Sequence, residues 1–216
     1  MSTPVFATKW QFVYAWVLIG VDRASGSFCG GRSDSGDDIV YVWTTDPGAA
    51  AALPEDVFAI QQITVRDLLA LLPAGTSVVV DPGSESGMTV EADLVVDLKR
   101  YVHPFPGGAV LECKVWDDLP ATVRDAVVRE VAARPFIEEV RAFLYTIDDS
   151  PYLGCIAYST SAGPEGQDSA IGAISGAMPA DMTQLDVASV SVVGLVDVPD
   201  DVRRALPPET LMYRAP

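Results

Sequence analysis

The stretch TVRDLLALLPAGTSVVVDPGSESGMTV, residues 64–90, decides the fold of its part of the chain. Thr64 can cap a helix in which Asp67 is the third following residue, an acidic variant of the capping-box spacing. The apolar residues that follow recur at helical spacing and share one face: Val65, Leu68, Leu69 and Leu72. Pro73 and Gly75 then end the helix. The pattern predicts a short helix with one buried side.

A strand and a turn are expected directly after this helix. Residues 77–80 are mostly β-branched, which is typical of a strand covered on both faces. Asp81-Pro82-Gly83 predicts a turn, because proline presets one dihedral angle and glycine permits a positive φ. Residues 88–98 are expected to be extended again. The stretch therefore predicts one helix–strand–hairpin unit.

The residues before this unit have the pattern of a small sheet. We predict strands at 11–20, 26–32 and 38–44, joined by hairpin loops at 22–26 and 34–38. Asp46-Pro47 predicts the start of a short helix, with the proline at its favoured first position. A further strand is predicted at 57–63.

The segment YVHPFPGG, residues 101–108, is rich in proline and glycine and is the best domain boundary. We therefore expect two modules, 1–108 and 109–216. The second half predicts the order α-β-β-α-β-α, with elements at 119–133, 140–147, 152–160, 169–178, 187–196 and 197–208. The predicted fold class is α+β: two small mixed modules, each a mostly antiparallel sheet with helices packed on it.

Part of the chain resembles the SseB family, bacterial proteins named for enhanced serine sensitivity. The match rests on Leu72-Pro73-Ala74-Gly75-Thr76 and on Asp81-Pro82-Gly83-Ser84, where the family more usually has Asn-Pro-Gly-Ser. Residues 117–216 are similar to the family's C-terminal domain, including the ending from Leu206 to Arg214. The resemblance covers about 55–213 and implies the fold above. It also implies a link to serine or sulfur metabolism, or to secretion and toxin–immunity loci.

The composition excludes several functions. Hydrophobic residues make up 49% of the 216 residues and the mean hydropathy is +0.25, which suits a sizeable core. The net charge is −16, from 30 acidic and 14 basic residues. Such a chain is repelled by nucleic-acid phosphates and by anionic membrane surfaces, so neither is an expected partner. A basic protein partner fits this charge, and so does a purely solubilising role.

The cellular location is expected to be the cytoplasm. The three cysteines, Cys29, Cys113 and Cys155, form no closed disulfide framework. No secretory signal is visible, and the apolar residues 12–20 are too few to cross a bilayer.

Catalytic chemistry has few candidates. His103 is the only histidine and lies in the boundary segment, without a nucleophile motif to serve. Cys29 precedes Gly30-Gly31-Arg32, so a thiol could lie beside a cation that lowers its pKa, although an ordinary strand position explains it as well. We predict no catalytic residue.

Cofactor and metal sites are not expected either. Asp34, Asp37 and Asp38 share a loop but lack the calcium-loop spacing, which favours a solvated turn. The glycine pairs lack the spacing of a phosphate-binding loop.

Aromatic residues give the last indication. Trp10, Phe12, Tyr14 and Trp16 alternate in the predicted strand, and Tyr41 and Trp43 lie on a neighbouring one. Cross-strand packing explains such a face. An exposed binding surface is the alternative, since tryptophan and tyrosine anchor interfaces. The predicted partner-binding residues are Trp10, Tyr14, Trp16, Tyr41 and Trp43.

We therefore predict a cytoplasmic, non-enzymatic interaction module that binds a protein or peptide partner, with self-association as an option. Two alternatives stay open: a thiol enzyme or redox sensor that uses Cys29, and small-molecule binding between the modules.

Overall fold

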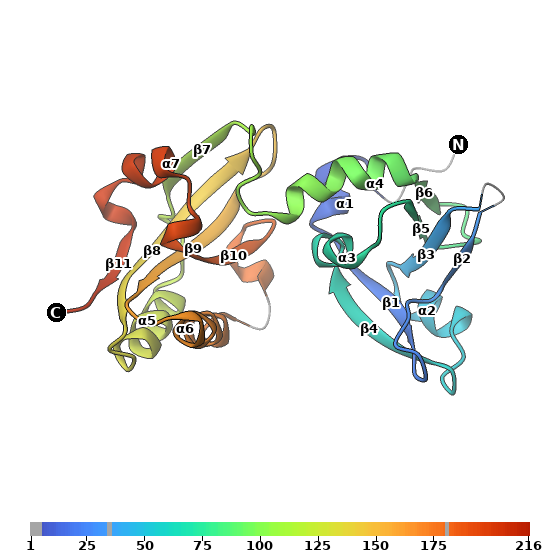
Figure 1. The fold of residues 1–216 in the computed structure, drawn as a ribbon, viewed down its shortest axis with the longest axis horizontal. Helices are drawn as coiled ribbons and strands as arrows, with labels where there is room; N and C mark the ends of the chain where they lie inside the picture. Colours follow the sequence, from blue (N-terminus) through green and yellow to red (C-terminus); the bar gives the residue numbers. More distant parts are fainter. Residues whose placement is uncertain (1–5, 34–35, 180–181) are drawn as a thin grey trace. The chain divides into compact units, whose positions relative to one another are not determined.

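The structure is a computed structural model that describes residues 6–33, 36–179 and 182–216 (Figure 1). It divides into two compact units, Met1–His103 and Pro104–Pro216, each with its own sheet. The division falls inside the proline-rich segment 101–108. The fold class is α+β, as the sequence predicts, with both sheets mixed and mostly antiparallel. Every helix in the described ranges is too short or too polar to cross a bilayer.

The sheet of the first unit has six strands in the order β4-β1-β3-β5-β6, with β2 paired to β3. Its strands are β1 (Trp16–Asp22), β2 (Gly30–Arg32), β3 (Asp38–Trp43), β4 (Phe58–Thr64), β5 (Thr76–Val80) and β6 (Met88–Val90). Only β3 and β5 run parallel. The parallel pair requires a long crossover, which the chain makes through α2, β4 and α3.

Helices lie on both sides of this sheet (Figure 1). They are α1 (Lys9–Val13), α2 (Asp46–Ala52), α3 (Val65–Leu71) and α4 (Ala92–Lys99), followed by the 3₁₀ turn η1 (Arg100–Val102). α3 contacts β4 and α4 contacts β5, whereas α2 contacts β1 and β3. Residues Val17 and Ile19 alternate with Leu18 along β1, so the two faces of the sheet have separate apolar cores.

The deciding stretch folds largely as its residues predict. Thr64 caps α3: its hydroxyl accepts from the Asp67 N–H at 3.1 Å and donates to the Asp67 carboxylate at 2.7 Å. Leu68 and Leu69 are fully buried. Asp81 ends β5 with a φ of 47°, and Gly83 follows at 79°. The predicted helix, strand and turn are confirmed.

The prediction that residues 88–98 are extended is wrong beyond Val90. β6 ends there and helix α4 begins at Ala92. Val95 and Leu98, three residues apart, are buried on one helical face. Asp93 in the first turn and Lys99 in the last favour the helix through its dipole.

The predicted strand at 11–20 is also wrong in its first part. Residues Lys9–Val13 form α1, and β1 begins only at Trp16. Thr8 caps α1 by accepting from the Gln11 N–H at 3.1 Å, and the Gln11 amide oxygen accepts from the Ala7 N–H at 2.7 Å. This reciprocal cap outweighs the alternation of aromatic residues.

The second unit contains a five-stranded sheet in the order β10-β9-β8-β11, with β7 paired to β8. Its strands are β7 (Leu111–Val115), β8 (Ile137–Ile147), β9 (Leu153–Thr160), β10 (Val190–Gly194) and β11 (Leu211–Arg214). β7 and β11 pair with different halves of the same edge of β8. β10 runs parallel to β9, and the other pairs are antiparallel.

Helices α5 (Ala121–Ala132) and α6 (Pro164–Gly176) pack on one face of this sheet. Their shared core includes Val123, Val127, Val131, Val140, Ala142, Leu144, Ile156, Ala170 and Ile174. The other face carries Phe143, Tyr145 and Cys155, which are fully buried. It is covered by the C-terminal turns η3 (Leu195–Asp197) and η4 (Pro208–Thr210), which contact β9 and β8. The helix α7 (Asp200–Ala205) lies between these turns along the chain.

The predicted order α-β-β-α-β-α lacks β7 and β11. β7 alternates half-buried residues with the exposed Glu112 and Lys114, so its apolar content is low. β11 has only four residues and a register shift against β8. Edge strands of this kind need little apolar surface, which explains why the pattern missed them.

Candidate partner-binding surface

The five aromatic residues predicted to bind a partner do not share one strand face. Trp10 lies on α1 and Tyr14 at its end, whereas Trp16 begins β1. Tyr41 and Trp43 lie on β3. Only Trp16 is largely exposed, at 55% of its surface, whereas Trp10 and Trp43 are buried. The predicted common aromatic face is therefore wrong.

Trp10 and Tyr14 belong to a packed cluster around α1. The Trp10 ring meets Tyr101 edge-on at 4.7 Å and stacks on Tyr14 at 6.0 Å. The Lys9 ammonium lies 4.5 Å above the Trp10 ring. Burial raises the pKa of the Tyr14 hydroxyl to about 12, although the positive charge of Arg66 acts in the opposite direction. This cluster anchors α1 and presents little aromatic surface to a partner.

Trp43 and Tyr41 support helix α2. Trp43 is 4% exposed and forms a small core with Ala49 of α2 and with Leu53, which directly follows this helix. Leu18 and Tyr41 also pack against this core. Trp43 and Tyr41 therefore contribute to packing, which is the usual role of aromatic residues on neighbouring strands.

Trp16 lies on a part of the sheet that α2 leaves uncovered. The register between β1 and β4 pairs Trp16 with Thr64, Leu18 with Gln62 and Gly20 with Ile60. Paired residues of antiparallel strands point to the same side, so these side chains share one face. Ile60 is 40% exposed and Gln62 is exposed as well. We call Trp16, Ile60 and Gln62, together with the outer edge of β4, the β4 surface.

β4 is an edge strand with an unusual sequence for that position. It stands first in the strand order, and no strand among the described residues pairs with its outer side. Its sequence FAIQQIT contains no charge and no proline, and its seven residues pair with β1 without a register shift. Edge strands are normally protected by charges, prolines or bulges against pairing with another chain. β4 has none of these protections.

Acidic residues lie directly before this strand. Glu55 and Asp56 are both exposed, and neither carboxylate forms an ion pair with a described residue. The Arg23 side chain donates to the backbone oxygen of Glu55 at 3.0 Å, and its backbone N–H donates to the Val57 oxygen at 2.9 Å. The carboxylates of Glu55 and Asp56 outnumber the Arg23 guanidinium beside them, so the start of the uncharged edge carries a net negative charge.

The structure does not activate Cys29. Cys29 is half-buried against the small core of Trp43, Ala49 and Leu53, and this burial raises the pKa of its thiol. Arg32, the cation predicted to lower that pKa, pairs with Asp38 at 3.3 Å on the surface. Burial also raises the pKa of Cys113, to about 11, with a further contribution from Asp201, and Cys155 is fully buried. The thiol hypothesis has no physical support at these positions.

The other candidate residues are dispersed. His103 is exposed at the end of the first unit. Of the acidic loop, Asp34 lies outside the described residues, and Asp38 belongs to β3. In the described part of the chain, no group of three or more metal-binding side chains comes together.

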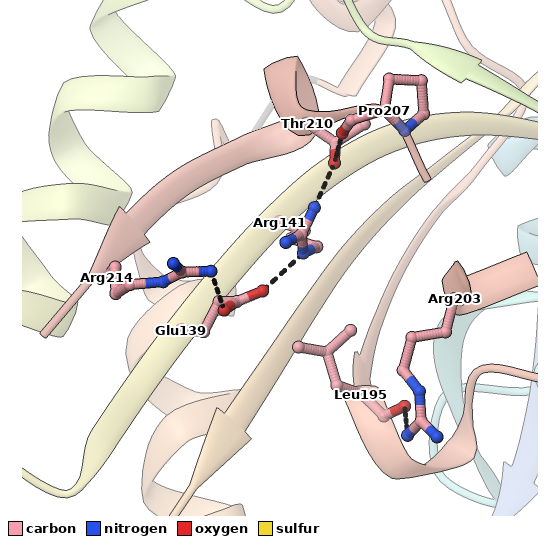
Figure 2. A network of polar contacts seen from close by, with 7 residues as sticks. All are labelled: Glu139, Arg141, Leu195, Arg203, Pro207, Thr210 and Arg214. Atoms are coloured by element: carbon pink, nitrogen blue, oxygen red, sulfur yellow. Dashed lines mark hydrogen bonds and ion pairs between the residues drawn. The ribbon is translucent and has the colours of Figure 1, made fainter. Parts of the chain in front are cut away.

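Sequence reasoning missed a polar cluster in the second unit (Figure 2). Glu139 on β8 accepts hydrogen bonds from Arg141 on the same strand and from Arg214 on β11, the latter at 2.8 Å. Arg141 also donates to the Thr210 hydroxyl at 3.1 Å, which in turn donates to the Pro207 oxygen at 2.6 Å. The cluster ties the C-terminal strand and turn to the centre of the sheet, which is a structural role.

No protein-family profile, curated protein or solved structure matches this chain. The resemblance of residues 64–90 to the SseB family therefore stays a prediction.

Proposed function

We propose that this chain is a non-enzymatic, cytoplasmic binding module that adds an extended segment of a partner protein to the outer edge of β4. The supporting observation is the unprotected edge itself. In this mode of recognition, main-chain hydrogen bonds supply affinity, and alternate side chains supply specificity. The exposed Trp16 and Ile60 would contact apolar side chains on one face of the added strand.

The charge distribution specifies the partner further. Glu55 and Asp56 precede β4, and the chain carries a net charge of −16. A segment in which apolar and polar residues alternate complements the exposed apolar side chains of the β4 surface. A lysine or arginine at the end beside Glu55 complements the negative charge there. A second copy of this chain is disfavoured as the occupant, because it would bring the same negative charge to the interface.

A peptide library tests the proposal. Random peptides are selected on the full chain and counter-selected on the variant Ile60→Lys, which places a charge beside the edge at a side chain that is 40% exposed. The matched control is Val96→Lys, which makes a similar change at an exposed position of α4. The expected peptides are basic and alternate apolar with polar residues. They should bind wild type and Val96→Lys with equal affinity, and bind Ile60→Lys with an affinity lower by about tenfold or more.

Two results would overturn it. One is a library in which every enriched peptide binds Ile60→Lys as tightly as wild type. The other is a chain that dimerises in sedimentation experiments and becomes monomeric with Ile60→Lys, because the occupant of the edge is then a second copy.

A further inference from the structure

The parallel strands β3 and β5 lie inside the sheet of the first unit, away from the β4 edge. Their register pairs Val42 with Val80, so the segments that follow both strands emerge at the same edge. In open α/β sheets, ligands bind in the crevice beyond the carboxyl ends of the parallel strands. A hollow of about 430 Å³ lies there, between these segments and α2.

The loop after β5 is held in a fixed conformation. The Asp81 N–H donates to the Val42 oxygen at 2.8 Å, and its φ of 47° lies in the left-handed region that aspartate tolerates. Thr44 holds the Asp81 carboxylate with its N–H at 2.8 Å and its hydroxyl at 2.6 Å. The carboxylate is thus fixed at the wall of the hollow before any ligand arrives.

The polar side chains of the hollow all end in oxygen. They are those of Thr44, Thr45, Asp81, Ser84 and Ser86. The hydroxyls of Ser84 and Ser86 lie 3.0 Å apart. Of the described residues that line the hollow, none is basic, and the Asp81 carboxylate forms no ion pair with a described side chain. The remaining wall is apolar and includes Trp43, Ala51 and Pro82.

This combination has a defined ligand chemistry. A fixed carboxylate without a counter-ion attracts a cation, and additional oxygen acceptors favour a cation with several N–H donors. A guanidinium offers five such donors in a planar fork and packs well beside apolar and aromatic groups. The volume falls within the range of ordinary ligand pockets.

We infer that this hollow, which we call the Asp81 hollow, binds a guanidinium group on a short alkyl stem. The guanidinium belongs either to an arginine side chain of another protein or to a free small molecule. The inference does not depend on the β4 surface, since it involves other residues.

The experiment follows backbone amide NMR signals of the full chain at physiological ionic strength, about 0.15 M, where non-specific attraction to an acidic protein is screened. The probes are n-butylguanidinium and its neutral analogue n-butylurea. The variant Asp81→Asn removes the charge and keeps a residue that accepts a left-handed φ. The control Asp186→Asn makes the same change at an exposed aspartate that also has a positive φ, 48°. Ala51→Leu narrows the hollow from α2 and leaves Asp81 intact.

The expected result is saturable shifts at Thr44, Ser84 and Ser86 with butylguanidinium and none with butylurea. Asp81→Asn and Ala51→Leu should each weaken binding about tenfold or more, and Asp186→Asn should not. A blocked peptide with one arginine, tested in parallel, shows by its relative affinity which source the hollow prefers. Equal binding of butylurea, or unchanged binding to both Asp81→Asn and Ala51→Leu, would overturn the inference.

Discussion

Arg214 of the last strand donates to the carboxylate of Glu139 on β8, with 2.8 Å between Nη2 and Oε2 (Figure 2). Arg141 binds the other oxygen of the same carboxylate. Burial alone would raise the pKa of Glu139, but the hydrogen bonds and charges of Arg214 and Arg141 outweigh it and hold the pKa below its ordinary value. The ionised carboxylate therefore stabilises the second unit.

Acid should weaken the second unit through Glu139. Because its pKa is lowered in the folded chain, the stabilisation is complete above the unfolded value of about 4.3 and is lost as the pH falls through the folded pKa. Glu139→Gln should lower the free energy of unfolding at neutral pH by about 1 kcal/mol, since the pair is partly exposed, and should remove this part of the acid dependence. Urea unfolding at several pH values measures both effects.

The control for this prediction is Glu138→Gln. Glu138 is the exposed neighbour on β8, and its carboxylate forms no ion pair with the described residues. An equal loss of stability in both variants would show that Glu139 acts only through the general charge of the chain.

Replacing either of two glycines of the second unit by alanine should change the free energy of unfolding, in opposite directions for the two positions. A methyl group at Gly154, the second residue of β9, would lie 2.5 Å from Cη2 of the buried Trp116. Gly154→Ala should cost about 1–3 kcal/mol through overpacking. Gly172 on α6 has open space around it, so Gly172→Ala should stabilise the helix by about 1 kcal/mol. Thermal or urea unfolding measures the stability of both variants. A Gly154→Ala chain as stable as wild type would contradict the packing described for Trp116.

Thiol labelling should show no activated cysteine. Since burial raises the pKa of Cys29 and of Cys113, both should label more slowly at neutral pH than a cysteine in a short peptide, and their rates should keep rising with pH. Cys155 should label only on unfolding, because it is fully buried. Fast labelling of Cys29 that is independent of pH near neutrality would restore the redox hypothesis.

Local sequence patterns correctly predicted those helices and strands in which the regularly spaced apolar residues are the ones buried in the fold. The helix and strand at 65–80 formed as expected, because Leu68 and Leu69 are buried on the predicted face. The aromatic alternation at 10–16 failed, because Thr8 and Gln11 cap a helix there; the spacing of these two residues was the available signal.

The candidate sites depend on pairings between distant segments. The sequence FAIQQIT is visibly uncharged, but its place at the sheet edge follows from the pairing of β4 with β1 alone. The Asp81 hollow likewise requires the parallel pairing of β3 and β5, which no local pattern specifies. Of the five predicted aromatic residues, only Trp16 lies on the β4 surface.

Tryptophan fluorescence tests the β4 surface most directly. Of the four tryptophans, Trp16 is 55% exposed, whereas Trp10, Trp43 and Trp116 are at most 6% exposed. Acrylamide should therefore quench mainly Trp16, and Trp16→Phe should remove the quenchable emission. A saturating selected peptide should protect Trp16 from acrylamide in the wild-type chain and in Val96→Lys. A peptide that binds tightly and leaves the quenching of Trp16 unchanged would contradict the proposal that partners add to β4.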